Sequence, residues 1–140
     1  MLIFGVDMLL DQEAQRLFSE LVKYDYTQIK LSGEIVSVRI FDNGGKILLS
    51  TTVYTGNRFI PNSVRQCVSQ RLQIGEGSIR TFLKIDEKEF KIWLHFLGVT
   101  SVLDCVKFKN LLEEFNWIAE EWREILEEHG KRDLIHVPRS

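Results

Sequence analysis

Proline and glycine are scarce in this sequence, with 2 prolines and 9 glycines among 140 residues. This scarcity excludes collagen-like and low-complexity chains, and a composition of 44% hydrophobic and 27% charged residues excludes an intrinsically disordered one. No internal repeat and no linker divides the chain. We therefore expect a single domain over residues 1–130 and a loosely ordered tail over residues 131–140.

The sequence also lacks an excess of charge of either sign. Its 18 Lys and Arg residues stand against 20 Asp and Glu residues, which gives a formal net charge of -2. A chain of this charge has no overall positive field that would collect nucleic acid or an anionic membrane. Any such binding would have to be local.

Long hydrophobic runs are missing too. No apolar run reaches the roughly 18 residues that are needed to cross a bilayer. Residues 1–10 are mostly apolar, but Asp7 interrupts them, and they have neither a basic start nor a small-residue cleavage site. These features do not fit a signal peptide, so we predict a cytoplasmic protein.

Residues that bind metals or act as nucleophiles are few and scattered. The two cysteines, Cys67 and Cys105, belong to no Cys-x-x-Cys pair and no Cys/His cluster, so we expect two buried, reduced thiols and no metal site. The histidines His95, His129 and His136 have no paired carboxylate or second ligand nearby in the sequence. This isolation is typical of structural or solvent-exposed histidines.

Motifs that mark catalysis are missing as well. The sequence has no Gly-x-Ser-x-Gly elbow, no Gly-rich phosphate loop and no His-Glu-x-x-His motif. The run Asp42-Asn43-Gly44 is similar to the start of a calcium-binding loop, but the glutamate that should end such a loop is missing. We therefore predict a protein that is not an enzyme and has no cofactor.

The first half of the chain changes its hydrophobic period after residue 24. Apolar residues at spacings of three and four predict an amphipathic helix over residues 8–24, with Asp7 or Asp11 as its N-cap. The period then becomes two, which is typical of strands. We expect strands over Thr27–Leu31, Glu34–Phe41 and Lys46–Tyr54.

The last two of these strands are predicted to form a hairpin. Asn and Gly readily adopt the positive φ angles that a type I′ turn requires, so Asn43 and Gly44 are expected at its centre. The hairpin would have one apolar face and one mixed face, the latter interrupted by Phe41 and Leu48. On the apolar face, the predicted pairs are Ile40 with Ile47, Val38 with Leu49, and Val36 with Thr51.

The second half of the chain predicts a short helix, a hairpin and a long helix. Pro61 fits the first turn of the short helix, whose apolar spacing continues to Leu72, although Asn62 or Ser63 could cap it instead. Strands are expected over Ser78–Ile85 and Phe90–Leu97, with residues 86–89 as the loop. The long helix is expected to start at a Ser101 cap, to run to about His129, and to end with Gly130 at the C′ position.

These elements predict an α+β fold with one mainly antiparallel sheet of about five strands. Helices at the N-terminus, in the middle and at the C-terminus would cover its apolar face. The run from Thr81 to Ile85, through Trp93 to Thr100, to Phe108 to Phe115, resembles the YbjN-like branch of the type III secretion chaperone-like superfamily. The resemblance implies a small cytoplasmic protein, often a homodimer, that binds other proteins. No family site residues carry over.

The reverse face of the second hairpin is the candidate binding site. With a four-residue loop, Arg80 lies opposite His95, Phe82 opposite Trp93, and Lys84 opposite Lys91. Aromatic residues flanked by cations have the composition of an interface hot spot, so these six residues are predicted to contact a partner. The alternative is that Phe82 and Trp93 form a second small core under a helix.

The predicted C-terminal helix is rich in acidic residues, whereas the second hairpin carries basic ones. A run of acidic residues on a helix usually forms a solvent-exposed face. The alternative is that this acidic side packs against the lysine-bearing strands, in the same chain or across a two-fold axis. The acidic residues are Glu113, Glu114, Glu120, Glu121, Glu124, Glu127 and Glu128.

A non-catalytic protein-binding module, chaperone-like or regulatory and acting as a homodimer, fits these observations best. It would dock a partner polypeptide on a face or an edge of the sheet. Two alternatives remain: a sheet that binds nucleic acid through its aromatic and basic residues, and a small-ligand carrier with a pocket between sheet and helix.

Overall fold

The structure, a computed structural model, describes residues 9–69 and 79–135, without the side chains of residues 132–135. The elements of these residues confirm the predicted α+β class. They are α1 (Asp11–Tyr24), β1 (Tyr26–Leu31), β2 (Glu34–Phe41), β3 (Lys46–Thr55), α2 (Asn62–Ser69), β4 (Thr81–Asp86), β5 (Lys91–Val99) and α3 (Cys105–Ile135).

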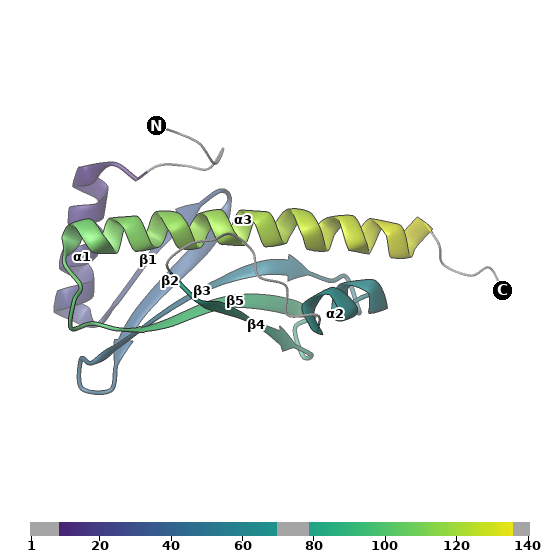
Figure 1. Ribbon diagram of the computed structural model, residues 1–140, viewed down its shortest axis with the longest axis horizontal. Helices are drawn as coiled ribbons and strands as arrows, with labels where there is room; N and C mark the ends of the chain where they lie inside the picture. Colours follow the sequence, from purple (N-terminus) through teal and green to yellow (C-terminus); the bar gives the residue numbers. More distant parts are fainter. Residues whose placement is uncertain (1–8, 70–78, 136–140) are drawn as a thin grey trace.

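The five strands form one antiparallel sheet in the order β1-β2-β3-β5-β4. Tight hairpins join β1 to β2, β2 to β3, and β4 to β5. The chain leaves β3, passes through α2 and enters the edge strand β4, so that β5 returns beside β3 (Figure 1).

The β2–β3 hairpin has the predicted register. Asn43 and Gly44 both have positive φ angles, as the type I′ prediction requires, and the Gly45 N–H donates to the Asp42 carbonyl at 3.0 Å. Ile40 lies opposite Ile47, and Val38 opposite Leu49.

The predicted register of the β4–β5 hairpin is wrong by two residues. Ile85 lies opposite Ile92 instead of Phe90, because β4 includes Asp86 and Phe90 belongs to the turn with a φ of 56°. The Asp86 carboxylate accepts the N–H groups of Lys88 and Glu89, at 3.0 and 3.2 Å, which fixes that turn. Because the shift is two residues, each side chain keeps its predicted face.

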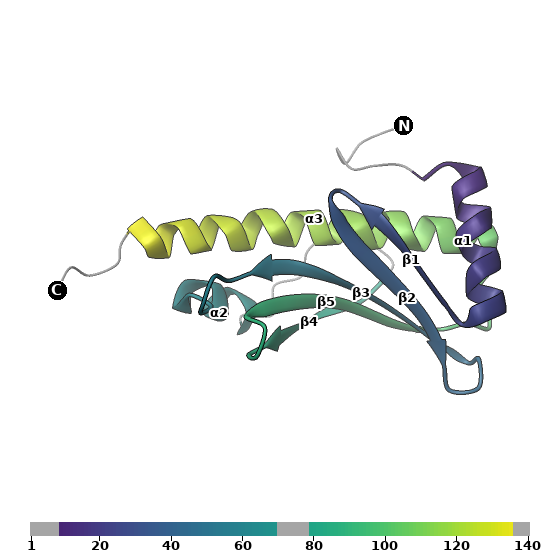
Figure 2. The ribbon, with the colours of Figure 1, turned by 180° about the vertical axis from the view of Figure 1, so that it is seen from behind.

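Helix α3 lies along one face of the sheet, with α1 near its N-terminal end and α2 near its C-terminal half (Figure 1, Figure 2). The core fills the space between α3 and the sheet. Its largest fully buried side chains include Phe108, Leu112, Phe115, Ile118 and Leu126 of α3, and Val36, Ile47, Leu49, Ile92 and Leu94 of the sheet.

Helix α3 starts later and ends later than predicted. Its first turn is capped by Asp104, whose carboxylate accepts the Lys107 N–H at 2.8 Å, and Ser101 lies outside the helix. Gly130 is buried inside the helix instead of ending it, and a Cβ there would lie 3.0 Å from the Tyr54 hydroxyl, a tight contact that glycine avoids. Residues 131–135 of the predicted tail are helical, and residues 136–140 lie outside the described residues.

The N-terminal ends of the two shorter helices also differ from the predicted ones. Helix α1 begins at Asp11 after Leu10, which has no side chain that could cap it, and Asp7 lies outside the described residues. Pro61 precedes α2 instead of lying in its first turn, and its carbonyl accepts the Arg65 N–H at 3.0 Å. Residues 70–78, which include the predicted end of this helix, are also outside the described residues.

Both cysteines are free thiols, with Cys67 buried and Cys105 half-buried. Burial raises the pKa of the Cys67 thiol. In the described part of the chain, no helix is long and apolar enough to cross a membrane. Over the same residues, no group of three or more His, Cys, Asp or Glu side chains could hold a metal ion.

Candidate functional site

The face of the sheet turned away from α3 has no helix over it in residues 9–69 and 79–135 (Figure 1, Figure 2). We call it the open face. Strand alternation and the observed pairing define its residues. They are Tyr26, Gln28 and Lys30 of β1; Ile35, Ser37, Arg39 and Phe41 of β2; Lys46, Leu48, Ser50 and Thr52 of β3; Lys91, Trp93, His95, Leu97 and Val99 of β5; and Phe82, Lys84 and Asp86 of β4.

Large apolar side chains are exposed on the open face. Phe82 is 49% exposed, Leu97 48% and Val99 59%, and Tyr26, Ile35 and Phe41 are exposed as well. The solvated face of an antiparallel sheet is normally polar. A contiguous apolar surface on such a face is typical of a binding site.

Five of the six predicted site residues, Phe82, Lys84, Lys91, Trp93 and His95, lie together on the open face, but their cross-strand partners differ from the prediction. Phe82 lies opposite His95, Lys84 opposite Trp93, and Asp86 opposite Lys91. The predicted pair of opposed lysines is therefore wrong. An opposite-charge pair replaces it, which removes a repulsion of a few tenths of a kcal/mol. Arg80 is exposed immediately before β4.

Aromatic rings cluster around His95 at the centre of β5. Its ring centroid lies 5.3 Å from that of Phe82 and 6.3 Å from that of Trp93, and the Trp93 ring is parallel to it within 10°. Phe82 is exposed and Trp93 only half-buried. For the described part of the chain, the alternative of a second core under a helix is therefore wrong.

The surroundings of His95 favour its neutral imidazole form. Its Nδ1 lies 2.8 Å from the Ser50 hydroxyl, which can donate to it or accept from it according to the tautomer. Burial lowers the pKa of His95, and the positive charge of Lys84 lowers it further, against an opposing hydrogen bond with the Leu49 backbone. The positive charge of Lys84 beside His95 would attract a partner carboxylate to this site.

Sequence reasoning missed the apolar residues on the β3 side of this face. Leu48 lies opposite Leu97, and Lys46 opposite Val99, so the apolar surface continues from β5 onto β3. Leu97 and Val99 lie at even spacings from Trp93 along the chain, and this period of two could have placed them on the same face as Trp93. The pairing of β3 with β5 was not predictable from local pattern, because α2 and β4 separate them in the chain.

The basic residues of the open face have few carboxylates to pair with. Lys91 lies opposite Asp86, and the Lys46 ammonium is 3.7 Å from the Asp42 carboxylate. Among the described residues, Lys84 and Arg39 form no ion pair; the Arg39 guanidinium lies 5.9 Å from the centroid of the Phe41 ring.

The acidic residues of α3 lie on the other side of the molecule. Trp122 and Leu126 of α3 are buried against the sheet, and Glu124 and Glu128 are exposed half a turn away. The predicted alternative that the acidic side of this helix packs against the lysine-bearing strands of the same chain is therefore wrong.

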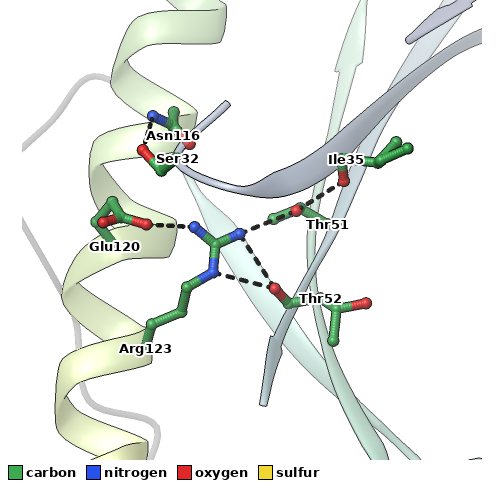
Figure 3. Close-up of polar contacts among 7 residues, drawn as sticks. All are labelled: Ser32, Ile35, Thr51, Thr52, Asn116, Glu120 and Arg123. Atoms are coloured by element: carbon green, nitrogen blue, oxygen red, sulfur yellow. Dashed lines mark hydrogen bonds and ion pairs between the residues drawn. The ribbon is translucent and has the colours of Figure 1, made fainter. Parts of the chain in front are cut away.

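Helix α3 also contacts the sheet through Arg123, at the point where β2 and β3 separate (Figure 3). The Arg123 Nε and Nη2 donate to the Thr52 carbonyl at 3.2 and 3.1 Å, and Nη2 donates to the Thr51 hydroxyl at 3.1 Å. Glu120 pairs with the same guanidinium. Arg123 thus satisfies a carbonyl of β3 that has lost its neighbouring strand, beside a register shift in β3.

A groove of about 320 Å³ lies beside Arg123, and its lining combines charged, hydroxyl and apolar side chains. The lining residues are Glu34, Thr52, Val53, Tyr54, Thr55, Arg123 and Glu127. The groove therefore lies between the sheet and α3, where the ligand-carrier alternative expects a pocket, and ligand binding there stays a prediction.

Known proteins resemble this chain in fold. No family model and no curated protein matches it. Among solved structures, it is similar to a chain of the ExoT-SpcS complex from Pseudomonas aeruginosa, with a TM-score of 0.50 and 14% sequence identity over 77% of this chain and 91% of that chain. This similarity shows a shared fold and agrees with the predicted α+β architecture, and membership of the secretion chaperone-like superfamily and of its YbjN-like branch stays a prediction.

Proposed function

We propose that this protein is a non-catalytic protein-binding module, chaperone-like or regulatory, which docks a partner polypeptide on the open face. The observation that carries the proposal is the uncovered apolar surface around Phe82, Trp93 and Leu97. Burying an apolar side chain stabilises a complex by roughly 1.5–3 kcal/mol when it leaves water completely. A partner that covers this face would gain several such contributions.

Different residues at this site would have different roles in binding the partner. Phe82 and Trp93 would anchor apolar groups of the partner, since rigid aromatic side chains lose little entropy on binding. Arg80, Lys84 and Lys91 would pair with its carboxylates. His95 lies between the two aromatic rings and would contact the same segment.

The similar structure gives independent support, because the ExoT-SpcS complex is itself an assembly of two proteins. The resemblance of this sequence to the YbjN-like branch also leads us to propose a cytoplasmic location and a homodimer. An interaction protein of this kind needs no catalytic group, and the sequence has none of the catalytic motifs that we searched for.

A matched pair of variants tests the proposal. Phe82→Ala/Trp93→Ala removes the anchors, and Val22→Ala/Val106→Ala removes two exposed apolar side chains from α1 and α3, which are 65% and 68% exposed. We expect a partner in native lysate to be retained by the wild type and by the helix variant, and to be retained roughly tenfold less by the open-face variant. Circular dichroism establishes that all three baits are folded.

Equal retention by the open-face variant would contradict the proposal. If no protein is retained by the wild type, the result favours the alternatives, which are a nucleic acid or a small ligand. Mass spectrometry of the retained chains separates these outcomes.

A further inference from the structure

We propose that the occupant of the open face is an acidic polypeptide segment with spaced apolar side chains, and not a second copy of this chain. This inference rests on the proposed function and specifies the chemistry of the partner. It follows from the distribution of charge over the two sides of the molecule and from the order of apolar residues on the open face.

The positive charge of the open face favours an acidic partner. Lys30, Arg39 and Lys84 have no ion-pair partner among the described residues, and Asp86 is the acidic residue among the strand positions that define the face. Covering this face with a neutral or basic segment would desolvate cations without pairing them, which is costly. Carboxylates of an acidic segment would pair with them instead.

A two-fold contact between two open faces would place like charges together. In such an isologous contact each residue meets the same surface of the partner, so Arg39 and Lys84 of both copies would enter one interface. Like charges brought together in an interface cost several kcal/mol. The face is therefore poorly suited to bind itself.

The acidic side of α3 offers no two-fold alternative. Helix α3, which carries the exposed Glu124 and Glu128, lies on one side of the sheet, and the open face lies on the other side (Figure 1, Figure 2). A contact between this acidic side and the open face of another copy is heterologous. It would build a ring or a filament of copies instead of a two-fold dimer. A homodimer would thus form through another surface and leave the open face available.

The apolar residues define a spacing for the partner. Along β5, Trp93 and Leu97 are four residues apart, a distance of about 13 Å, with His95 between them. Each apolar position has a cation close by: Lys84 lies opposite Trp93, and Arg39 lies opposite Leu48, which faces Leu97. We expect two apolar side chains about 13 Å apart, the separation of positions i and i+4 in an extended segment, with acidic residues near them.

The same surface favours protein over nucleic acid. Leu48, Leu97, Val99 and Ile35 are aliphatic side chains, which bury apolar groups but do not provide the flat rings on which bases stack. The carboxylates on the far side of α3 also repel a long polyanion that approaches the molecule.

A selection from a random 12-residue peptide display library tests the inference with the intact protein. The baits are the wild type, Arg39→Glu/Lys84→Glu, and the matched control Lys107→Glu/Lys131→Glu, which makes the same change of charge on exposed residues of α3. A fourth bait, Phe82→Ala/Trp93→Ala, tests the proposed function in the same experiment. All baits are examined by circular dichroism and analytical ultracentrifugation.

The inference predicts that the wild type and the control enrich peptides rich in Asp and Glu with apolar residues at i and i+4. Arg39→Glu/Lys84→Glu should enrich basic apolar peptides instead, with at least tenfold weaker binding of the acidic ones. Wild-type peptides without an acidic bias that bind both charge variants equally would overturn the inference, while their loss in Phe82→Ala/Trp93→Ala would still support the proposed function.

Three further outcomes are decisive. No enriched peptide on any bait would contradict the proposed function itself. Self-association of the wild type that disappears in Arg39→Glu/Lys84→Glu would assign the open face to a second copy. Binding of a labelled oligouridine that requires Arg39 and Lys84 would likewise overturn the inference in favour of nucleic acid.

Discussion

His95 is the residue that joins the aromatic and the charged parts of the open face. It stacks near Trp93, contacts the Phe82 ring, and lies close enough to Lys84 for that ammonium to lower its pKa. A charged imidazole would add one more cation to a basic surface. Burial and then the charge of Lys84 lower the pKa of His95, which favours the neutral form that an apolar partner group can contact.

The titration of His95 gives a prediction at the residue scale. Burial and Lys84 lower its pKa below the ordinary value of 6.5, so the folded protein binds the proton more weakly than the unfolded chain. The stability that this difference contributes is fully present above about pH 6.5. It is lost as the pH falls below 6.5 toward the lowered pKa.

An NMR titration of the His95 ring proton measures this pKa directly. We expect a value below 6.5 in the wild type and a rise toward 6.5 in Lys84→Met, with no change in Lys107→Met, whose side chain lies on α3. A wild-type pKa at or above 6.5, or one that Lys84→Met leaves unchanged, would show that the electrostatic account of this site is wrong.

At the scale of elements, local signals predicted most of the fold. The Asn43-Gly44 turn fixed the register of the β2–β3 hairpin because few residue pairs adopt its φ angles. The β4–β5 register was wrong because the Asp86 turn forces Phe90 into a left-handed conformation that its residue type does not favour. No local pattern signals such a residue.

Local signals also predicted part of the candidate site. An error of two residues in register preserves the faces of both strands, so Phe82, Trp93 and His95 were correctly expected on one face. Leu48 was missed because its addition to the site requires the pairing of β3 with β5, and Val99 was missed because the predicted strand ended at Leu97. The end of α3 was missed because Gly130 lies inside the helix, packed closely against Tyr54, a contact between residues far apart in the chain.

Arg123 gives a prediction at the scale of elements, because it joins α3 to the separated edge of β3. Arg123→Met keeps much of the apolar stem but leaves the Thr52 carbonyl without its two donors and Glu120 without its cation. We expect the free energy of unfolding to fall by about 1–3 kcal/mol, the cost of an unsatisfied, partly buried polar group. Urea denaturation followed by circular dichroism measures this loss.

Arg16→Met is the matched control for Arg123. Arg16 pairs with Glu20 at 3.1 Å, but both side chains are largely exposed, so its replacement should cost less than about 0.5 kcal/mol. Equal losses in the two variants would mean that the contact between Arg123 and β3 does not stabilise the protein.

At the scale of the whole molecule, the helices lie on one side of a single sheet. All three pack on or beside the face that carries the core, which leaves the opposite face of the described residues bare (Figure 1, Figure 2). Bare faces of antiparallel sheets are stable in water when they are polar. This one has exposed Phe82, Leu97 and Val99, so its composition is better explained by a partner than by solvent.

The most direct measurement of this account is photo-crosslinking in native lysate from two single positions. The photoreactive amino acid p-benzoylphenylalanine replaces Phe82 on the open face in one protein and Val106 on α3 in the other, and both positions are exposed. The account predicts crosslinks to a partner polypeptide from position 82, with none to the same partner from position 106. Crosslinks from position 106 alone would contradict it.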